Sequence, residues 1–153
     1  MKKGKAGCGL ILDHKDRTLL QRKDSGSWYW PNYWCLFGGV VEEGEDPSKT
    51  FEREIREEIG INLLCYKLFS IEGVEEISKQ DPTKEIRRFT EVYYFAGKFD
   101  GNLENVRLGE GAGFSVFDRE ELARYNQFGL IVPPNYMAIE RFYKAFGEGT
   151  FKL

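Results

Sequence analysis

Residues 39–61 read GVVEEGEDPSKTFEREIREEIGI, and they are the most informative part of the chain about its fold. Residues 42–58 hold eight acidic and three basic side chains, a formal charge of −5, whereas the whole chain of 153 residues carries only −3. Like charges three or four residues apart destabilise a helix by a few tenths of a kcal/mol per pair. This concentration of negative charge therefore needs a cause.

A helix is predicted over residues 47–59. Asp46 is a suitable N-cap, Pro47 fits the first helical turn, and Gly60 is a suitable stop. An apolar stripe with a spacing of four residues must pack against the rest of the domain. Its members are Phe51, Ile55 and Ile59.

Three glutamates, Glu54, Glu57 and Glu58, fall in an arc of roughly 100° beside that stripe. Carboxylates are hard oxygen ligands, and neither His nor Cys lies nearby, so the pattern favours Mg²⁺, or Mn²⁺, over zinc or copper. Because Mg²⁺ often takes substrate phosphates as further ligands, the helix indicates phosphate chemistry. The alternative is a solvated charged face, in which Arg53 forms a surface pair with Glu57.

The spacing of this stretch resembles the Nudix box, Gly-x5-Glu-x7-Arg-Glu-apolar-x-Glu-Glu-x-Gly-apolar. All fixed positions are present, and they are Gly39, Glu45, Arg53, Glu54, Ile55, Glu57, Glu58, Gly60 and Ile61. The resemblance implies a Nudix-type α/β/α sandwich with a mixed β-sheet, in one domain spanning residues 1–153. It also implies a magnesium-dependent pyrophosphohydrolase.

The resemblance further implies roles for single residues. Glu54, Glu57 and Glu58 would be the metal-binding carboxylates, with the carbonyl of Gly39 as a further ligand. Arg53 would hold these carboxylates in place, and Glu45 would brace the box. Many family members carry another glutamate in a later loop, and Glu110 occupies a suitable position as a metal ligand or general base.

The sequence pattern also predicts the elements around the box. Strands are expected at residues 7–12, 17–22, 33–37, 63–74, 86–99 and 113–117. A short helix is expected after Asp118, which with Glu121 resembles a capping box. A last helix is expected after residues 133–135. Strands mixed with helices are typical of an α/β domain.

Aromatic side chains are concentrated just before the box, where Trp28, Trp30 and Trp34 include every tryptophan of the chain. Trp34 is expected in the core. Trp28 and Trp30 are candidates for stacking on a substrate base, the alternative being packing within a loop. Arg22, at the end of a predicted strand, is a candidate phosphate contact or an ordinary surface charge.

Composition excludes several other classes of protein. A net charge of −3 is unfavourable for duplex nucleic acid, and no apolar run is long enough to span a membrane. Cys8, Cys35 and Cys65 show no C-x-x-C spacing, so reduced thiols and a cytoplasmic location are expected. The oligomeric state stays open, a homodimer included.

The predicted function is hydrolysis of a phosphoanhydride bond in a small nucleoside diphosphate derivative, with a nucleoside triphosphate, oxidised forms included, as the leading substrate. Nucleotide sugars and dinucleotides are the alternative substrates. A non-catalytic nucleotide sensor on the same fold is a different class, but it would not need an intact set of metal ligands. Isoprenoid diphosphate isomerases of the family need additional Cys and Glu groups that the sequence does not reveal.

Overall fold

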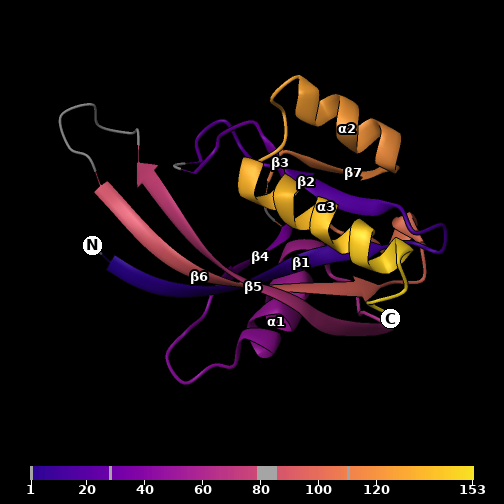
Figure 1. Cartoon of the computed structure of the whole chain (residues 1–153), viewed down its shortest axis with the longest axis horizontal. Coiled ribbons are helices and arrows are strands. Elements are labelled where there is room, and N and C mark those ends of the chain that lie inside the picture. The colour runs from indigo at the N-terminus through magenta and orange to yellow at the C-terminus, as the bar shows by residue number, and fades with distance from the viewer. Residues whose placement is uncertain (1, 28, 79–85, 110) are drawn as a thin grey trace.

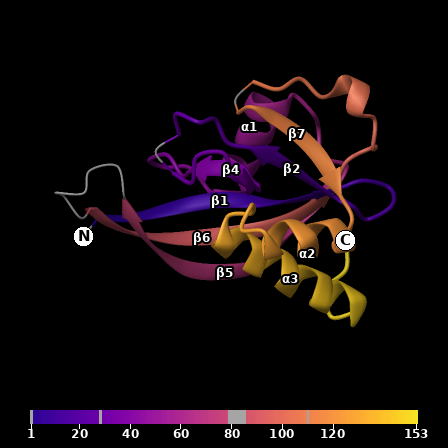
Figure 2. The same cartoon turned by 90° about the horizontal axis from the view of Figure 1, so that it is seen from above.

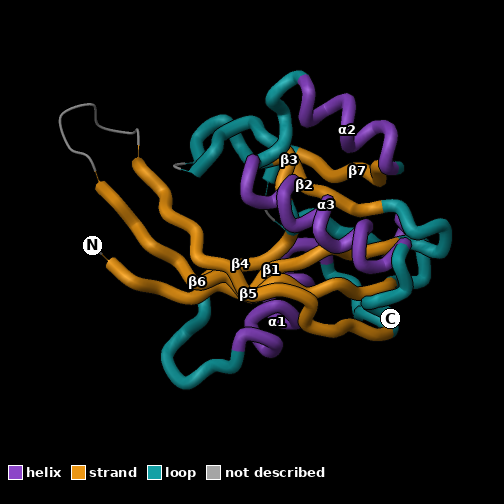
Figure 3. The backbone as a smooth tube through the Cα atoms, in the orientation of Figure 1, coloured by secondary structure: helices purple, strands orange, loops and turns teal. Residues whose placement is uncertain are grey.

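The computed structural model describes residues 2–27, 29–78, 86–109 and 111–153. Its elements follow the chain as shown in Figure 1 and, by type, in Figure 3. They are β1 (Lys2–Leu12), β2 (Thr18–Arg22), β3 (Trp34–Cys35), β4 (Phe37–Val40), α1 (Pro47–Ile59), β5 (Cys65–Ser78), β6 (Ile86–Lys98), the 3-10 helix η1 (Leu103–Asn105), β7 (Gly113–Phe117), α2 (Arg119–Gln127) and α3 (Pro133–Gly147).

Strand β1 organises the sheet. It runs parallel to β6 from Lys2 to Leu12, and its other edge is shared by two antiparallel strands. Residues 6–9 pair with β4, whereas residues 11 and 12 pair with β2. Strand β5 pairs with β6, and β3 and β7 pair with β2, in each case antiparallel. The parallel pairing of β1 with β6 among antiparallel pairs confirms the predicted mixed sheet.

Helices cover both faces of this sheet, as Figure 2 shows, with α1 on one face and α2 and α3 on the other. The predicted apolar stripe of α1 is buried in one cluster, where it meets residues such as Ile11, Phe37 and Phe95. A second cluster joins the opposite face of the sheet to Ile139 and Phe142 of α3. The α/β/α layering is therefore as predicted.

Local signals located several elements well. Helix α1 has the predicted bounds, with the Asp46 carboxylate accepting from the backbone N–H of Ser48 and Gly60 in the left-handed conformation at φ 67°. Strand β7 also has its predicted bounds. Asp118 and Glu121 form the capping box expected at the start of α2.

Other predicted boundaries were wrong. Strand β1 begins at Lys2 rather than at residue 7, because pairing with β6 extends it through a polar stretch. The strand expected at 33–37 is two strands, interrupted at Leu36, whose N–H donates to the side chain of Asn135 at 3.0 Å. Strand β5 spans Cys65–Ser78 rather than 63–74, since it follows β6 to the end of their shared ladder.

The last helix includes the prolines that were expected to precede it, because Pro133 occupies its first turn, where no backbone N–H is needed. Within the described ranges, no helix is long and apolar enough to cross a membrane.

Candidate active site

Helix α1 presents its three glutamates with graded exposure. Glu58 is buried at 3% exposure, Glu54 is 16% exposed, and Glu57 is 57% exposed. The apolar stripe fixes the rotation of the helix, and the glutamates accordingly lie between the core and solvent. The arc predicted from helical spacing is thus present on the folded molecule.

Glu58 is held by two donors from the sheet. One of its carboxylate oxygens accepts the backbone N–H of Gly38 at 3.0 Å, and the other accepts the side-chain amide of Gln21. Gln21 lies on β2 and is itself buried. No pattern in the sequence indicates this contact, because residues 21 and 58 are brought together only by the packing of α1 on the sheet.

All three nitrogens of the Arg53 guanidinium donate hydrogen bonds to neighbouring carboxylates. Its Nε and Nη2 donate to the two carboxylate oxygens of Glu45 at 2.9 and 3.1 Å. Its Nη1 donates to Glu54 at 2.9 Å and to Glu57 at 3.2 Å. A planar fork with several donors suits this arrangement better than a single ammonium would.

Glu45 is the acidic centre of the loop before α1. Besides Arg53 it accepts the hydroxyl of the buried Thr50 at 2.6 Å and the backbone N–H of Glu42 at 3.2 Å. The hydrogen bonds from Arg53, and then from Thr50, lower the pKa of Glu45 to about 2. Glu45 is therefore ionised at neutral pH and links the loop to the first turns of the helix.

Gly39 allows the close approach of the loop and the helix. A β-carbon at residue 39 would overlap the carboxylate of Glu54. Gly39 belongs to β4, which is paired with β1 through Gly7. The backbone beside Glu54 is therefore fixed by the sheet.

The donors here fit a divalent cation of the magnesium type. They are carboxylate oxygens, with the backbone of Gly39 lying against the carboxylate of Glu54, and oxygen ligands of this kind are those that Mg²⁺ prefers. Among the residues that the structure describes, no three His, Cys, Asp or Glu side chains are already arranged to hold a metal ion by themselves. Mg²⁺ usually retains water and needs only one or two carboxylates together with substrate phosphates, so an open site of this kind suits it.

The predicted residue Glu110 lies outside the described residues, but both of its neighbours contact the site. The N–H of Gly109 donates to the carbonyl of Glu58 at 2.7 Å. A β-carbon on Gly111 would lie 3.1 Å from the side-chain oxygen of Gln21. Gly109 therefore lies against the end of α1, and Gly111 lies close to β2.

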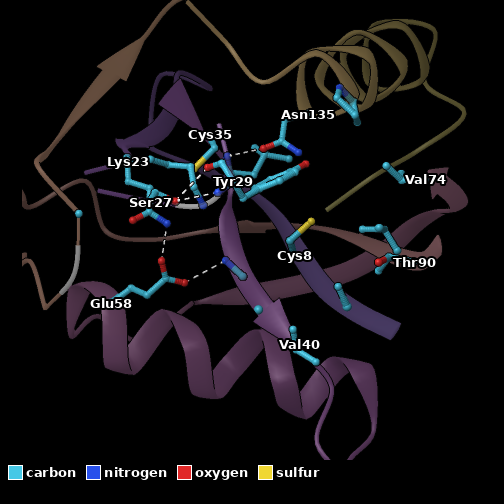
Figure 4. Close-up of a pocket in the computed structure, with 18 of the residues that line it drawn as sticks. Cys8, Lys23, Ser27, Tyr29, Cys35, Val40, Glu58, Val74, Thr90 and Asn135 are labelled. Carbon is cyan, nitrogen blue, oxygen red and sulfur yellow. Dashed lines mark hydrogen bonds between the residues drawn. The ribbon is translucent and has the colours of Figure 1, made fainter. Parts of the chain in front are cut away.

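A cavity of about 530 Å³ opens beside Glu58. Its walls come from β1, β5 and β6, from the loop after β2, from β4 and from the start of α3, as Figure 4 shows. Polar residues of the lining include Gln21, Lys23, Asp24, Ser27, Glu58, Arg88, Thr90 and Asn135. This volume is in the range of pockets for small ligands.

The loop before β3 contributes to this cavity differently from the prediction. Tyr29 lines it, and the ammonium of Lys23, another lining residue, lies 4.9 Å from the centre of the Tyr29 ring. Trp30 is not among the lining residues and packs edge-on against Tyr33, with ring centroids 5.0 Å apart. Trp28 lies outside the described residues.

Arg22 is exposed at the end of β2, and its backbone carbonyl accepts the N–H of Ala112 at 2.8 Å. Its neighbour Lys23 lines the cavity instead. Trp34 packs against the core next to Phe117 and Tyr125, as its position in a strand predicted.

Two of the three cysteines also line the cavity. Burial raises the pKa of the Cys8 thiol, and it raises the pKa of Cys35 to about 12, so both are neutral thiols at physiological pH. Sequence spacing did not indicate that Cys8 and Cys35 share one cavity, because they lie on different strands of the sheet.

The chain belongs to the NUDIX domain family, whose model matches residues 2–137. It is therefore a Nudix hydrolase by family. It is 32% identical over 126 residues to the nucleoside triphosphatase NudI of Escherichia fergusonii, covering 78% of this chain and 84% of that protein. It is also 35% identical over 68 residues to a prenyl-diphosphate phosphatase of Methanosarcina mazei, covering 44% of this chain and 39% of that protein.

Solved structures share the fold. The crystal structure of a MutT protein from Methanosarcina mazei Go1 has a TM-score of 0.69 at 22% identity, covering 94% of each chain. The dihydroneopterin triphosphate pyrophosphohydrolase of E. coli has a TM-score of 0.67 at 18% identity, covering 93% of this chain and 97% of the other. At these identities the likeness concerns the fold alone.

Proposed function

We propose that this Nudix hydrolase cleaves a phosphoanhydride bond of a nucleoside triphosphate in a Mg²⁺-dependent reaction. The observation that supports this most is the position of the Glu58 carboxylate in the wall of a cavity large enough for a small ligand. Triphosphates at the carboxylates of α1 would leave the nucleoside part within that cavity. The relative that matches over most of its length, NudI, is a nucleoside triphosphatase by name.

The metal would be held by Glu54, Glu57 and Glu58 with the carbonyl of Gly39. When bound, Mg²⁺ would neutralise the charge of the phosphates and orient them. Arg53 keeps Glu54 and Glu57 in position through the contacts described above, and Gln21 does the same for Glu58. Lys23, at the cavity wall, adds a positive charge for the phosphate chain.

In the reaction, the oxygen of water forms a bond to one phosphorus while the bridging P–O bond breaks. The leaving phosphate departs with the electron pair of that bond, and a carboxylate accepts the proton lost by water. We propose Glu110, the residue that the sequence suggested, as the acceptor of that proton, since its neighbour Gly109 donates its N–H to the carbonyl of Glu58. Positioning and charge stabilise the transition state of phosphoryl transfer, so no covalent intermediate is needed.

The test is a screen of nucleotides with Mg²⁺ in H₂¹⁸O, with products identified by mass. The expected result is release of a nucleoside monophosphate and pyrophosphate, or of a diphosphate and phosphate, with ¹⁸O marking the phosphorus attacked. Nucleotide sugars, dinucleotides and a prenyl diphosphate belong in the same screen. Exclusive turnover of one of these would overturn the triphosphate assignment, and binding without turnover of any compound would indicate a sensor.

A variant at Glu58 links the activity to the site. Glu58→Gln should abolish most turnover, and the wild-type protein should lose activity in a chelator and regain it with Mg²⁺. The matched control is Glu120→Gln, an exposed glutamate on α2, which should keep full activity. Normal turnover in a Glu58→Gln protein whose circular dichroism matches wild type would refute the assignment of the metal ligands.

A further inference from the structure

One row of the sheet places a polar side chain next to a glycine. Thr90 of β6 is paired with Gly4 of β1 on one side and with Val74 of β5 on the other. Residues directly opposite one another in adjacent strands project from the same face of a sheet. Gly4 has no side chain, and a β-carbon there would lie 3.7 Å from Nη2 of Arg88. On this side of Thr90 the row is therefore bordered by the guanidinium of Arg88 and not by a side chain of β1.

The hydroxyl of Thr90 stands out among the buried polar groups. Thr90 is only 5% exposed, and across the described residues no hydrogen bond to its hydroxyl is found. The other buried polar side chains described all have hydrogen-bond partners; they are Asp13, Thr18, Gln21, Thr50, Glu58 and Asn135. The Thr90 oxygen is not one of the fully enclosed atoms without a hydrogen-bond partner, which among the described residues are Asp16 Oδ1 and Arg141 Nε. It is therefore accessible from the cavity, where a bound ligand can hydrogen-bond to it.

The surroundings of Thr90 restrict the ligand. Thr90 lines the same cavity as Val74, Val92, Ala6 and Cys8, which are small or apolar, and Arg88 adds a charged group two positions earlier on β6. Such a wall suits the apolar faces of a flat ring, and a single hydroxyl suits a hydrogen-bonding group at the edge of that ring. A prenyl chain has no polar edge and would leave the hydroxyl unsatisfied.

The position of Thr90 relative to Glu58, where the phosphates are proposed to bind, also supports a ring as the ligand at Thr90. Figure 4 shows Glu58 on helix α1 and Thr90 on a strand, at separate walls of one cavity. A substrate whose phosphates lie at Glu58 can therefore extend its other end toward Thr90.

We propose that Thr90 is a specificity-determining residue whose hydroxyl hydrogen-bonds the edge of a substrate nucleobase lying in this cavity. The inference rests on the proposed nucleoside triphosphatase function, since it assigns the recognition of the base to the same site. The proposal requires that the part of the substrate farthest from its phosphates is a heterocyclic ring with polar atoms at its edge.

The test compares Thr90→Val with Thr90→Ser and Thr18→Val. Thr90→Val removes the hydroxyl at nearly constant volume, and Thr90→Ser keeps it. Thr18→Val is the control for loss of a buried threonine hydroxyl away from the cavity, because Thr18 pairs with Tyr143 at 2.7 Å. Each variant is assayed for kcat and KM on the four nucleoside triphosphates and on ribose 5-triphosphate, which has the phosphates but no base.

Thr90→Val should raise KM for the preferred nucleoside triphosphate about 3- to 10-fold, the usual worth of one neutral hydrogen bond. Its kcat and its KM for ribose 5-triphosphate should be unchanged, and Thr90→Ser should restore the wild-type KM. Thr18→Val should lower the melting temperature without changing KM.

Equal KM values for wild type and Thr90→Val on every base, in a protein that does hydrolyse nucleoside triphosphates, would overturn the role of Thr90 alone. A wild-type protein that hydrolyses no nucleoside triphosphate would overturn the proposed function and this inference with it. A melting curve for each variant excludes misfolding, and Thr90→Ser keeps the comparison valid if Thr90→Val is unstable.

Discussion

The carboxylate of Glu54 lies against the α-carbon of Gly39, in the space that a β-carbon on residue 39 would need. Gly39→Ala should therefore displace Glu54 rather than merely stiffen the strand. Displacement of a catalytic group by about 1 Å can cost about 100-fold in rate, and we expect a loss of that order in kcat at saturating Mg²⁺. Gly147→Ala, where open space surrounds the added methyl group, should keep wild-type kcat. A Gly39→Ala enzyme with wild-type kcat would show that the position of Glu54 is not critical.

Arg53 joins Glu45 to Glu54 and Glu57, and its loss should release all three. Arg53→Ala should weaken Mg²⁺ affinity about 10- to 100-fold, as is usual for residues that orient metal ligands. Arg53→Lys should recover part of this loss, since it restores the charge without the planar fork. Lys49, whose pair with Glu52 on the same helix is exposed, provides the control, because surface pairs contribute under about 1 kcal/mol. Calorimetric titration with Mg²⁺ measures the affinity of each variant. Equal losses of Mg²⁺ affinity in Arg53→Ala and Lys49→Ala would contradict the role given to Arg53.

Glu45 should make stability depend on pH in the acidic range. Its pKa in the folded protein is lowered to about 2, chiefly by Arg53, from an ordinary value of 4.5. A lowered pKa means that its contribution to stability is fully present above about pH 4.5 and is lost as the pH falls toward 2. The difference in melting temperature between wild type and Glu45→Gln should thus be constant above pH 4.5 and shrink below it. A difference that stays constant from pH 6 to pH 2.5 would be inconsistent with this pKa.

Tyr29, rather than Trp30, should bind the base from the loop side of the cavity, because Tyr29 lines it and Trp30 packs on Tyr33. Tyr29→Ala should raise KM for nucleoside triphosphates by about 5- to 150-fold, corresponding to the ~1–3 kcal/mol of one stacked base. Tyr29→Phe keeps the ring and should retain the wild-type KM. Trp30→Ala should instead lower the melting temperature at unchanged KM. The opposite assignment of the two effects would restore Trp30 as the stacking residue that the sequence suggested.

The sequence allowed the prediction of features whose causes are local. The bounds of α1 follow from Asp46, Pro47 and Gly60, which act within one turn of the helix. The arrangement of its glutamates follows from helical spacing once the buried stripe is known. The family pattern then extended these local signals to a fold.

Features that depend on distant residues could not be predicted in this way. The interruption at Leu36 depends on Asn135, which is 99 positions away in the chain. The start of β1 at Lys2 depends on its pairing with Arg88. Likewise, the selection of Tyr29 over Trp30 for the cavity depends on how one loop folds over the sheet, and no periodic pattern in the sequence specifies that.

The alternation of side chains along β6 bears on how the substrate range of this enzyme could be altered by directed evolution. Val92 packs on the side of α3 and lines the cavity together with Thr90, whereas Tyr93 and Phe95 pack on the side of α1. A combinatorial library restricted to residues 90 and 92 would therefore reshape the cavity without disturbing the support of the catalytic helix. Residues 90 and 92 are thus the positions to vary when new substrates are selected. Tyr93 and Phe95 are the positions to keep unchanged, so that the rate of hydrolysis is preserved.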